Sequence, residues 1–197
     1  MLQISVTLPS GQGETFSLEP SSKVGDLRVL AQKSFQRGFL RLVAADQRVD
    51  PSKSLQDAGL EDGDHLTASA VDAKLAATDQ AFALFCAGGD QVVTWGAPDC
   101  GGDSSEVQDQ LKGVQQVQAT LGGAFAAILA DGSVVTWGDP FSGGDSSEVQ
   151  DQLKGVQQVQ ATSGAFAAIL AGGSVVTWGR PDDGGHSSAV SDQFAFV

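Results

Sequence analysis

The chain has 197 residues, of which 41% are hydrophobic and 18% charged, an ordinary composition for one or two globular domains. No apolar run approaches the ~20 residues of a membrane-spanning helix, and the first ten residues lack the basic start and continuous apolar run of a signal peptide. We therefore expect a cytoplasmic or nuclear protein without membrane insertion.

The net charge of -13 is concentrated in the second half of the chain. Residues 1–74 hold 10 acidic and 8 basic residues, whereas residues 75–197 hold 14 acidic and 3 basic residues. Nucleic acids and anionic membranes are bound through Lys and Arg, so this acidic half is not expected to bind either of them. Acidity of this kind favours solubility.

A β-hairpin is predicted at the N-terminus. Apolar residues alternate with polar ones from Leu2 to Leu8, which is the period of a strand with one buried face. A glycine-containing turn at residues 9–13 follows, and Phe16 with Leu18 begins a second alternating segment.

A helix and further short strands are predicted next. The helix has one apolar stripe, made of Val24, Leu27, Leu30, Ala31 and Phe35. Ser21 or Ser22 is the expected N-cap. Strand-like segments then follow at residues 39–44, at Val49 and around Leu66. This order predicts an α+β domain in which one helix covers a mixed sheet.

The segments "QISVTLPSG", "FLRLVAADQRV" and "SLQDAGLEDGDHLTAS" resemble successive pieces of ubiquitin, in the same order. The resemblance implies a ubiquitin-like β-grasp domain over residues 1–71, followed by a linker at residues 72–79. Ubiquitin is conjugated through a Gly-Gly just after its last strand, and this chain has "ASAVDAKLAATD" there. We therefore expect an embedded domain that is not conjugated.

The same resemblance implies a partner-binding patch at Leu8, Val43 and Ser69. Val43 corresponds to the centre of the apolar patch by which ubiquitin is held, and Leu8 or Pro9 to its hairpin loop. Ser69 and Thr67 replace a valine and a histidine of ubiquitin, which weakens the patch. Two interpretations remain open, namely binding of ubiquitin-receptor proteins and a scaffold domain in which Val43 is only a strand residue.

The second half is an array of repeats. The stretch "GGDSSEVQDQLKGVQQVQAT" occurs at residues 101–120 and again at 143–162, and Trp95, Trp137 and Trp178 are spaced by 42 and 41 residues. Periods of 20–50 residues are typical of solenoids and propellers. In each unit we predict three strands, with the Trp in the core, and a shorter fourth element in the loop.

"DGSVVTWGDPFSGGDSS" followed by "LKGVQQVQATSGAFAAIL" resembles the repeats of the regulator of chromosome condensation family, and those of a secreted β-lactamase-inhibitory protein. This implies an all-β partial propeller of antiparallel blades over residues 80–197, with two full units at 101–142 and 143–183 plus partial units. Propellers close with about four to eight blades. The chain is therefore expected to be a fragment, to pair with other chains, or to form an open stack that self-associates through its blade edges.

No catalytic, cofactor-binding or metal-binding residues are predicted. Cys86 falls in an apolar strand, and Cys100 falls in a loop without a basic neighbour that would activate it. His65 and His186 lie one in each half, without clustered partners. The Asp and Gly residues of the loops lack the ligand spacing of known calcium motifs.

These observations favour a non-enzymatic protein-protein interaction protein. Both resemblances lead to modules that occur around ubiquitin signalling, including in large HECT-type ligases, so an adaptor role there is the first hypothesis. A structural or assembly subunit, docked permanently in a larger multi-protein complex, is the alternative.

Overall fold

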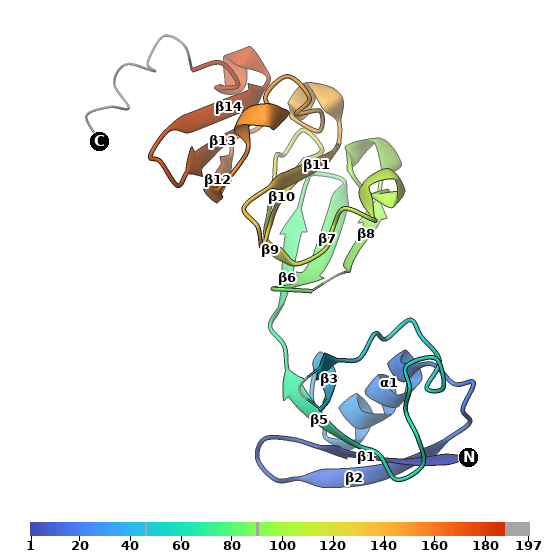
Figure 1. The fold of residues 1–197 in the computed structure, drawn as a ribbon. Coiled ribbons are helices and arrows are strands. Elements are labelled where there is room, and N and C mark those ends of the chain that lie inside the picture. Colours follow the sequence, from blue (N-terminus) through green and yellow to red (C-terminus); the bar gives the residue numbers. More distant parts are fainter. Residues whose placement is uncertain (46, 90, 188–197) are drawn as a thin grey trace. The chain divides into compact units, whose positions relative to one another are not determined.

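The computed structural model describes residues 1–45, 47–89 and 91–187. The chain divides into two compact units, Met1–Asp72 and Ala73–Val197. Within the described residues the protein is mostly β, built from small sheets together with one α-helix (Figure 1).

The N-terminal unit contains a five-stranded mixed sheet with the strand order β2-β1-β5-β3-β4. Its strands are β1 (Leu2–Thr7), β2 (Gly13–Leu18), β3 (Leu40–Ala44), β4 (Gln47–Arg48) and β5 (His65–Ala70). The central pair, β1 and β5, is parallel, and the other neighbours are antiparallel. The predicted hairpin is formed by β1 and β2.

Helix α1 (Val24–Ser34) covers one face of this sheet. The predicted stripe is buried at Val24, Leu27, Ala31 and Phe35. Leu30 was expected there too, but its side chain is 39% exposed. The N-cap is Lys23 rather than Ser21 or Ser22, since the Lys23 amide donates to Asp26 Oδ2 at 3.0 Å.

The second unit contains three antiparallel sheets of three strands each among its described residues. We call them repeat sheets 1, 2 and 3. Repeat sheet 1 consists of β6 (Ala73–Ala77), β7 (Ala81–Cys86) and β8 (Val92–Gly96). Repeat sheet 2 consists of β9 (Val114–Ala119), β10 (Ala124–Leu129) and β11 (Val134–Gly138). Repeat sheet 3 consists of β12 (Val156–Ala161), β13 (Ala165–Leu170) and β14 (Val175–Gly179).

Repeat sheet 1 corrects two expectations. Residues 72–79 were predicted to be a linker, but residues 73–77 form β6 and pair with β7. The first unit, expected to be partial, therefore has the same three strands as the others. Thr78 explains the equivalence, because its hydroxyl accepts a hydrogen bond from the Ala81 amide at 2.9 Å. The same bond joins Thr120 to Ala124 at 3.0 Å.

The shorter fourth element expected in the loops is a short 3-10 helix, and such helices occur in each loop between the sheets. Three of the 3-10 helices follow a Trp-Gly pair, and each of the three begins with a proline, at Pro98–Cys100, Pro140–Ser142 and Pro181–Asp183. Leu111 and Leu153 anchor the two repeated loops, and both side chains are fully buried or nearly so. The repeated stretch is thus a packed connection that leads into the next sheet.

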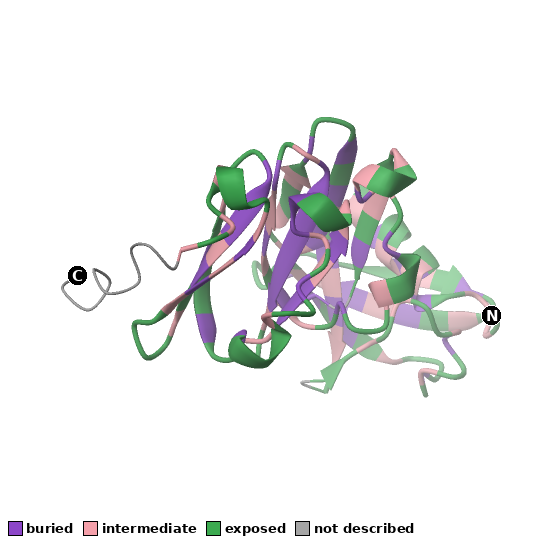
Figure 2. Ribbon diagram, turned by 90° about the horizontal axis from the view of Figure 1, so that it is seen from above, coloured by how far each residue is buried: buried purple, intermediate pink, exposed green. Residues whose placement is uncertain are grey.

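Each repeat sheet packs its two faces on different neighbours. In β10, Phe125 and Ala127 join the apolar core shared with repeat sheet 1. The alternate residues Ala124, Ala126 and Ile128 join the core shared with repeat sheet 3. Successive side chains of a strand point to opposite faces, so repeat sheet 2 is covered on both. Figure 2 shows buried residues concentrated on strands and exposed ones on the loops.

Each joint between repeat sheets is formed around a glycine. Phe125 stacks on Trp137 with ring centroids 5.1 Å apart, and Trp137 Nε1 donates to the Gly101 carbonyl at 3.1 Å. A Cβ on Gly101 would lie 2.5 Å from the Phe125 ring. The glycine therefore lets the aromatic pair of one sheet approach the loop that follows the preceding sheet.

Substitution Gly101→Ala should destabilise the protein more than Gly173→Ala. Both glycines have positive φ, +86° and +82°, so both variants carry backbone strain of about 1–2 kcal/mol. Only the Gly101 Cβ meets a ring, and overpacking of this kind adds about 1–3 kcal/mol. Urea unfolding measures the difference, and equal losses of unfolding free energy would contradict the joint described above.

Candidate interaction surfaces

Leu8 does not contribute to the predicted partner-binding patch. It follows the end of β1, its side chain is only 6% exposed, and it belongs to the core beneath α1. The inward alternation of Ile4 and Val6 continues to Leu8, which directs this side chain away from solvent. The prediction for Leu8 was wrong, and the exposed residues of this turn begin at Pro9.

Val43 and Ser69 lie on the sheet face opposite the helix, and both are half-buried. The strand register aligns four residues across this face, in the order Thr7, Thr67, Val43 and Arg48. Ser69 pairs with Arg41 in a different row of the same two strands. Val43 is thus flanked by a threonine and an arginine rather than by apolar side chains.

Hydrogen bonds between side chains make the rest of this face polar. Thr7 Oγ1 and His65 Nε2 share a hydrogen bond of 2.8 Å, and Ser5 with Thr15 share another of 2.8 Å. Gln3 Nε2 donates to Ser17 Oγ at 3.0 Å. A partner that docks here would meet a hydrophilic surface with Val43 at one point.

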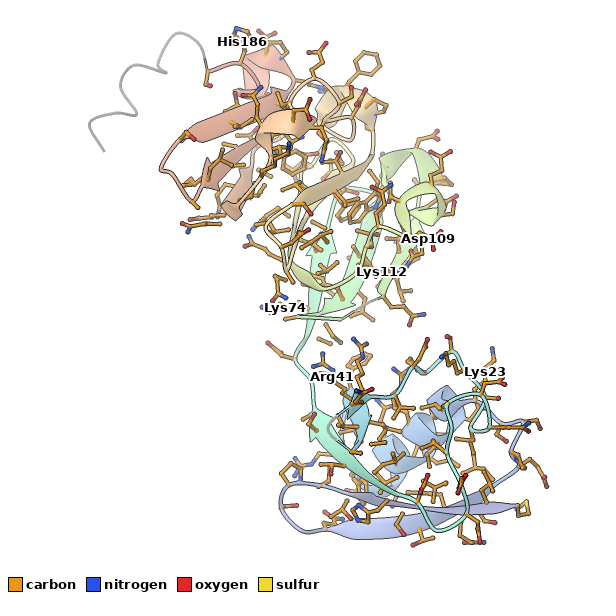
Figure 3. The ribbon with its side chains drawn as sticks, in the orientation of Figure 1. Lys23, Arg41, Lys74, Asp109, Lys112 and His186 are labelled. Atoms are coloured by element: carbon orange, nitrogen blue, oxygen red, sulfur yellow. The ribbon has the colours of Figure 1, made fainter. Side chains whose placement is uncertain are left out.

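The candidate reactive side chains are not brought together. His65 is bonded to Thr7 in the first unit, and Figure 3 places His186 in the loop after β14. Cys86 and Cys100 are free and half-buried. Across the residues that the structure describes, no group of three or more His, Cys, Asp or Glu is arranged to hold a metal ion.

A shallow hollow of about 490 Å³ lies beside β4 and the turn after it. Charged side chains of both signs line it, namely Arg48, Asp50, Lys53 and Asp57. The Ser52 hydroxyl and amide donate to Asp50 and hold the pKa of its carboxyl below the usual 3.8. Asp50 is therefore an ionised turn residue at neutral pH and is not suited to act as a general acid.

The loop aspartates of the repeats have the same role. Asp131 Oδ1 accepts from the Ser133 hydroxyl at 2.6 Å and from its amide at 2.9 Å, and these bonds lower the pKa of Asp131. Asp103 and Asp145 each accept hydrogen bonds from the serine two residues later. The bond from its amide, followed in size by the one from its hydroxyl, lowers the pKa of each aspartate. These carboxylates stabilise turns.

An apolar surface is exposed on repeat sheet 1, on the side facing away from repeat sheet 2. We call it the head face, and its large side chains, with their exposed fractions, are Leu75 (61%), Phe82 (44%), Val93 (53%) and Trp95 (45%). The corresponding residues of repeat sheet 2 are Val117, Phe125, Val135 and Trp137, none more than 8% exposed. Trp95 was expected in a core and is half exposed, whereas Trp137 and Trp178 are buried as predicted.

A second, smaller apolar surface lies at the other end of the array. We call it the tail face of repeat sheet 3, and it consists of Ala167, Ile169 and Val175. Ile169 is 42% exposed, whereas Ile128 at the same position of repeat sheet 2 is 5% exposed. Within the part of the chain that the structure describes, the head and tail faces are therefore the uncovered ends of one repeating arrangement.

The sequence pattern contained part of this information. The identical "VVTWG" segments predict a core position for all three tryptophans. A sequence repeat does not record whether a neighbouring sheet covers each tryptophan. Recognising that repeat sheet 1 is the first of the series requires its strand β6, whose "AKLAAT" shares only the final Ala-Thr with "VQQVQAT". Leu75 of the head face lies in that strand.

No protein-family model matches the chain, and no curated protein matches it significantly. A solved structure, "Crystal structure of ATBAG1 in complex with HSP70", contains a chain with a TM-score of 0.33 and 14% identity. The match covers 35% of this chain and 40% of that chain, less than half of either. A likeness this slight carries no argument about fold or function. No helix among the described residues is long and apolar enough to cross a membrane.

The Asp131 turn should make stability depend on pH in the acid range. A lowered folded-state pKa means that ionised Asp131 stabilises the fold above pH 3.8, and that this contribution is lost as the pH falls further. Asp131→Asn keeps an acceptor for Ser133 but cannot titrate, so its urea midpoint should fall less than that of the native chain between pH 5 and about 3. Asp131→Ala should lower the midpoint already at pH 7. Identical pH profiles for the native chain and Asp131→Asn would contradict this role.

Proposed function

We propose that this chain is a non-enzymatic protein-protein interaction protein whose main docking surface is the head face of repeat sheet 1. The exposed stack of Phe82 on Trp95 carries the proposal, with ring centroids 5.4 Å apart. The same pair is buried at both internal joints. A large apolar surface rimmed by polar residues is typical of interaction sites.

A partial propeller is the architecture we propose for the second unit. Three antiparallel sheets in sequence, each packed face to face on the next, support it. For the first unit we propose a ubiquitin-like β-grasp domain. The order β2-β1-β5-β3, the parallel central pair and the helix on one face support that assignment.

An adaptor role in ubiquitin signalling is the finer proposal, and it rests on the outer face around Val43. This face holds a half-buried valine at the position that ubiquitin receptors contact in ubiquitin. Polar neighbours at Thr67 and Arg48 limit the apolar area, so binding of ubiquitin-receptor proteins should be weak.

The alternative is a structural subunit held permanently in a larger assembly. Exposure at both ends of the array favours it, because no described residue gives the head face or the tail face the apolar cover that the internal faces have. Permanent complexes have more hydrophobic interfaces than transient ones. A partner that stays bound through dilution and extended washing identifies this case, and a partner that exchanges identifies the adaptor.

The docking role is tested by comparing three baits, namely the native chain and two variants, in an extract of the source cells. Trp95→Arg places a charge on the head face in place of a ring that stacks on Phe82, and it should abolish capture of proteins that the native chain retains. Phe141→Arg is the matched control, since Phe141 is a 79% exposed aromatic residue outside both end faces. Equal capture by all three baits would refute the head face as the docking surface.

The ubiquitin-receptor proposal is tested by titrating an isolated ubiquitin-binding domain. Val43→Ala removes two methyl groups and should weaken binding about tenfold, at about 0.8 kcal/mol for each carbon buried in the contact. Val29→Ala on the exposed side of α1 is the control, and it should leave the affinity unchanged. Absent binding, or equal affinity for the two variants, would rule out this finer role.

A further inference from the structure

The head face and the tail face are the two halves of a joint that already occurs twice within the chain. We call the face of a repeat sheet opposite its Phe-Trp pair the far side. At the first joint the far side of repeat sheet 1 packs on Phe125 and Trp137 of repeat sheet 2. At the second joint the far side of repeat sheet 2 packs on Phe166 and Trp178 of repeat sheet 3. The surface that fits the head face is therefore the far side of a repeat sheet, and the tail face is the far side of repeat sheet 3.

Gly184 provides a second, independent match. Gly101 and Gly143, which support the aromatic pairs at the internal joints, have φ angles of +86° and +99°, and Gly184 has +100°. A Cβ at Gly101 or Gly143 would lie 2.5 or 2.6 Å from a Phe ring, whereas one at Gly184 would have no atom within 4 Å. The loop after repeat sheet 3 thus has the backbone of a joint, but among the described residues no aromatic pair packs on it as at the other two.

Trp95 is the matching group on the head face. At the internal joints Trp137 Nε1 donates to the Gly101 carbonyl at 3.1 Å, and Trp178 Nε1 donates to the Gly143 carbonyl at 3.0 Å. Among the described residues, Trp95 Nε1 has no such acceptor. Its ring is already stacked on Phe82 as the other two pairs are stacked. The head face is therefore organised for docking before any partner binds.

We propose that the head face binds the tail face of a second copy of this chain, with Phe82 packed over Gly184 of that copy and Trp95 Nε1 donating to its carbonyl. This inference rests on the proposed docking function and names the partner. Two copies bring together six repeat sheets, which lies within the four to eight blades of closed propellers. Head-to-tail contacts that close give a ring with twofold symmetry and two identical joints.

Charge sets the conditions under which the second copy binds. Residues 75–197 carry 14 acidic and 3 basic residues, so two such units repel each other at low ionic strength. Salt screens this repulsion, with a Debye length of about 8 Å at 0.15 M. The contacts in the joint are apolar, so salt does not weaken them. Self-association should therefore tighten as salt is raised.

The experiment is a measurement of mass by sedimentation or light scattering over a range of concentrations of the full chain. The native chain should reach twice the monomer mass, as should the control Phe141→Arg. Trp95→Arg on the head face and Ile169→Arg on the tail face should each be monomeric, with self-association at least about tenfold weaker. An equimolar mixture of these two variants should form a dimer, because each retains the face that the other needs.

Three results would overturn the proposal. One is a native chain that remains monomeric at every concentration, and another is a mass that grows without limit, which excludes closure by two copies. The third is an Ile169→Arg variant that dimerises alone while Trp95→Arg does not, which indicates pairing of two head faces. A monomeric native chain whose head face still captures another protein would leave the proposed function standing, so the two failures are distinguishable.

Gly184→Ala keeps the test decisive if an arginine variant fails to fold. Its Cβ would meet no atom within 4 Å among the described residues, but it would lie against Phe82 of the second copy. It should therefore weaken dimerisation, while Gly63→Ala in the N-terminal unit, where φ is +90° and a Cβ would meet no atom within 4 Å, should not. Equal dimerisation of the two glycine variants would overturn the assignment of Gly184. Circular dichroism and a cooperative thermal transition establish that each variant is folded.

Discussion

The contact between a Phe-Trp pair and a glycine of the preceding loop is the constraint on which the second unit depends. A single three-stranded sheet has too little apolar surface to be stable alone, so each repeat sheet relies on its neighbours. The glycine lets the rings reach the loop backbone, and the indole hydrogen bond fixes their position there. The repeated stretch that joins successive sheets has the same length in both copies, and each copy brings its glycine against the next aromatic pair.

The first unit could be predicted largely from its apolar periodicity. The hairpin, the helix and the later strands follow from alternation and from one helical stripe, since burial of one face imposes both periods. The errors concern positions where tertiary contacts decide. Leu8 was placed in an exposed loop but continues the inward alternation, and the polar face around Val43 arises from cross-strand pairs that only the register reveals.

The repeats could be predicted as units but not as an array with two ends. Identical letters at Trp95, Trp137 and Trp178 conceal opposite environments, because exposure depends on whether another sheet lies alongside. Strand β6 was missed since it is identical to its counterparts only at Ala77 and Thr78. The candidate surface follows from this geometry, which one sequence does not record.

The alternation along β10, with each side of the strand packed on a different neighbour, also governs how the array folds. Repeat sheet 2 gains apolar contacts from both sides, whereas repeat sheets 1 and 3 each gain them from one side within the chain. In such a nearest-neighbour system the stability of a sheet rises with the number of its neighbours. Opening should therefore begin at the two ends and reach the centre last, so that the middle sheet keeps its backbone amides protected from solvent exchange for longest.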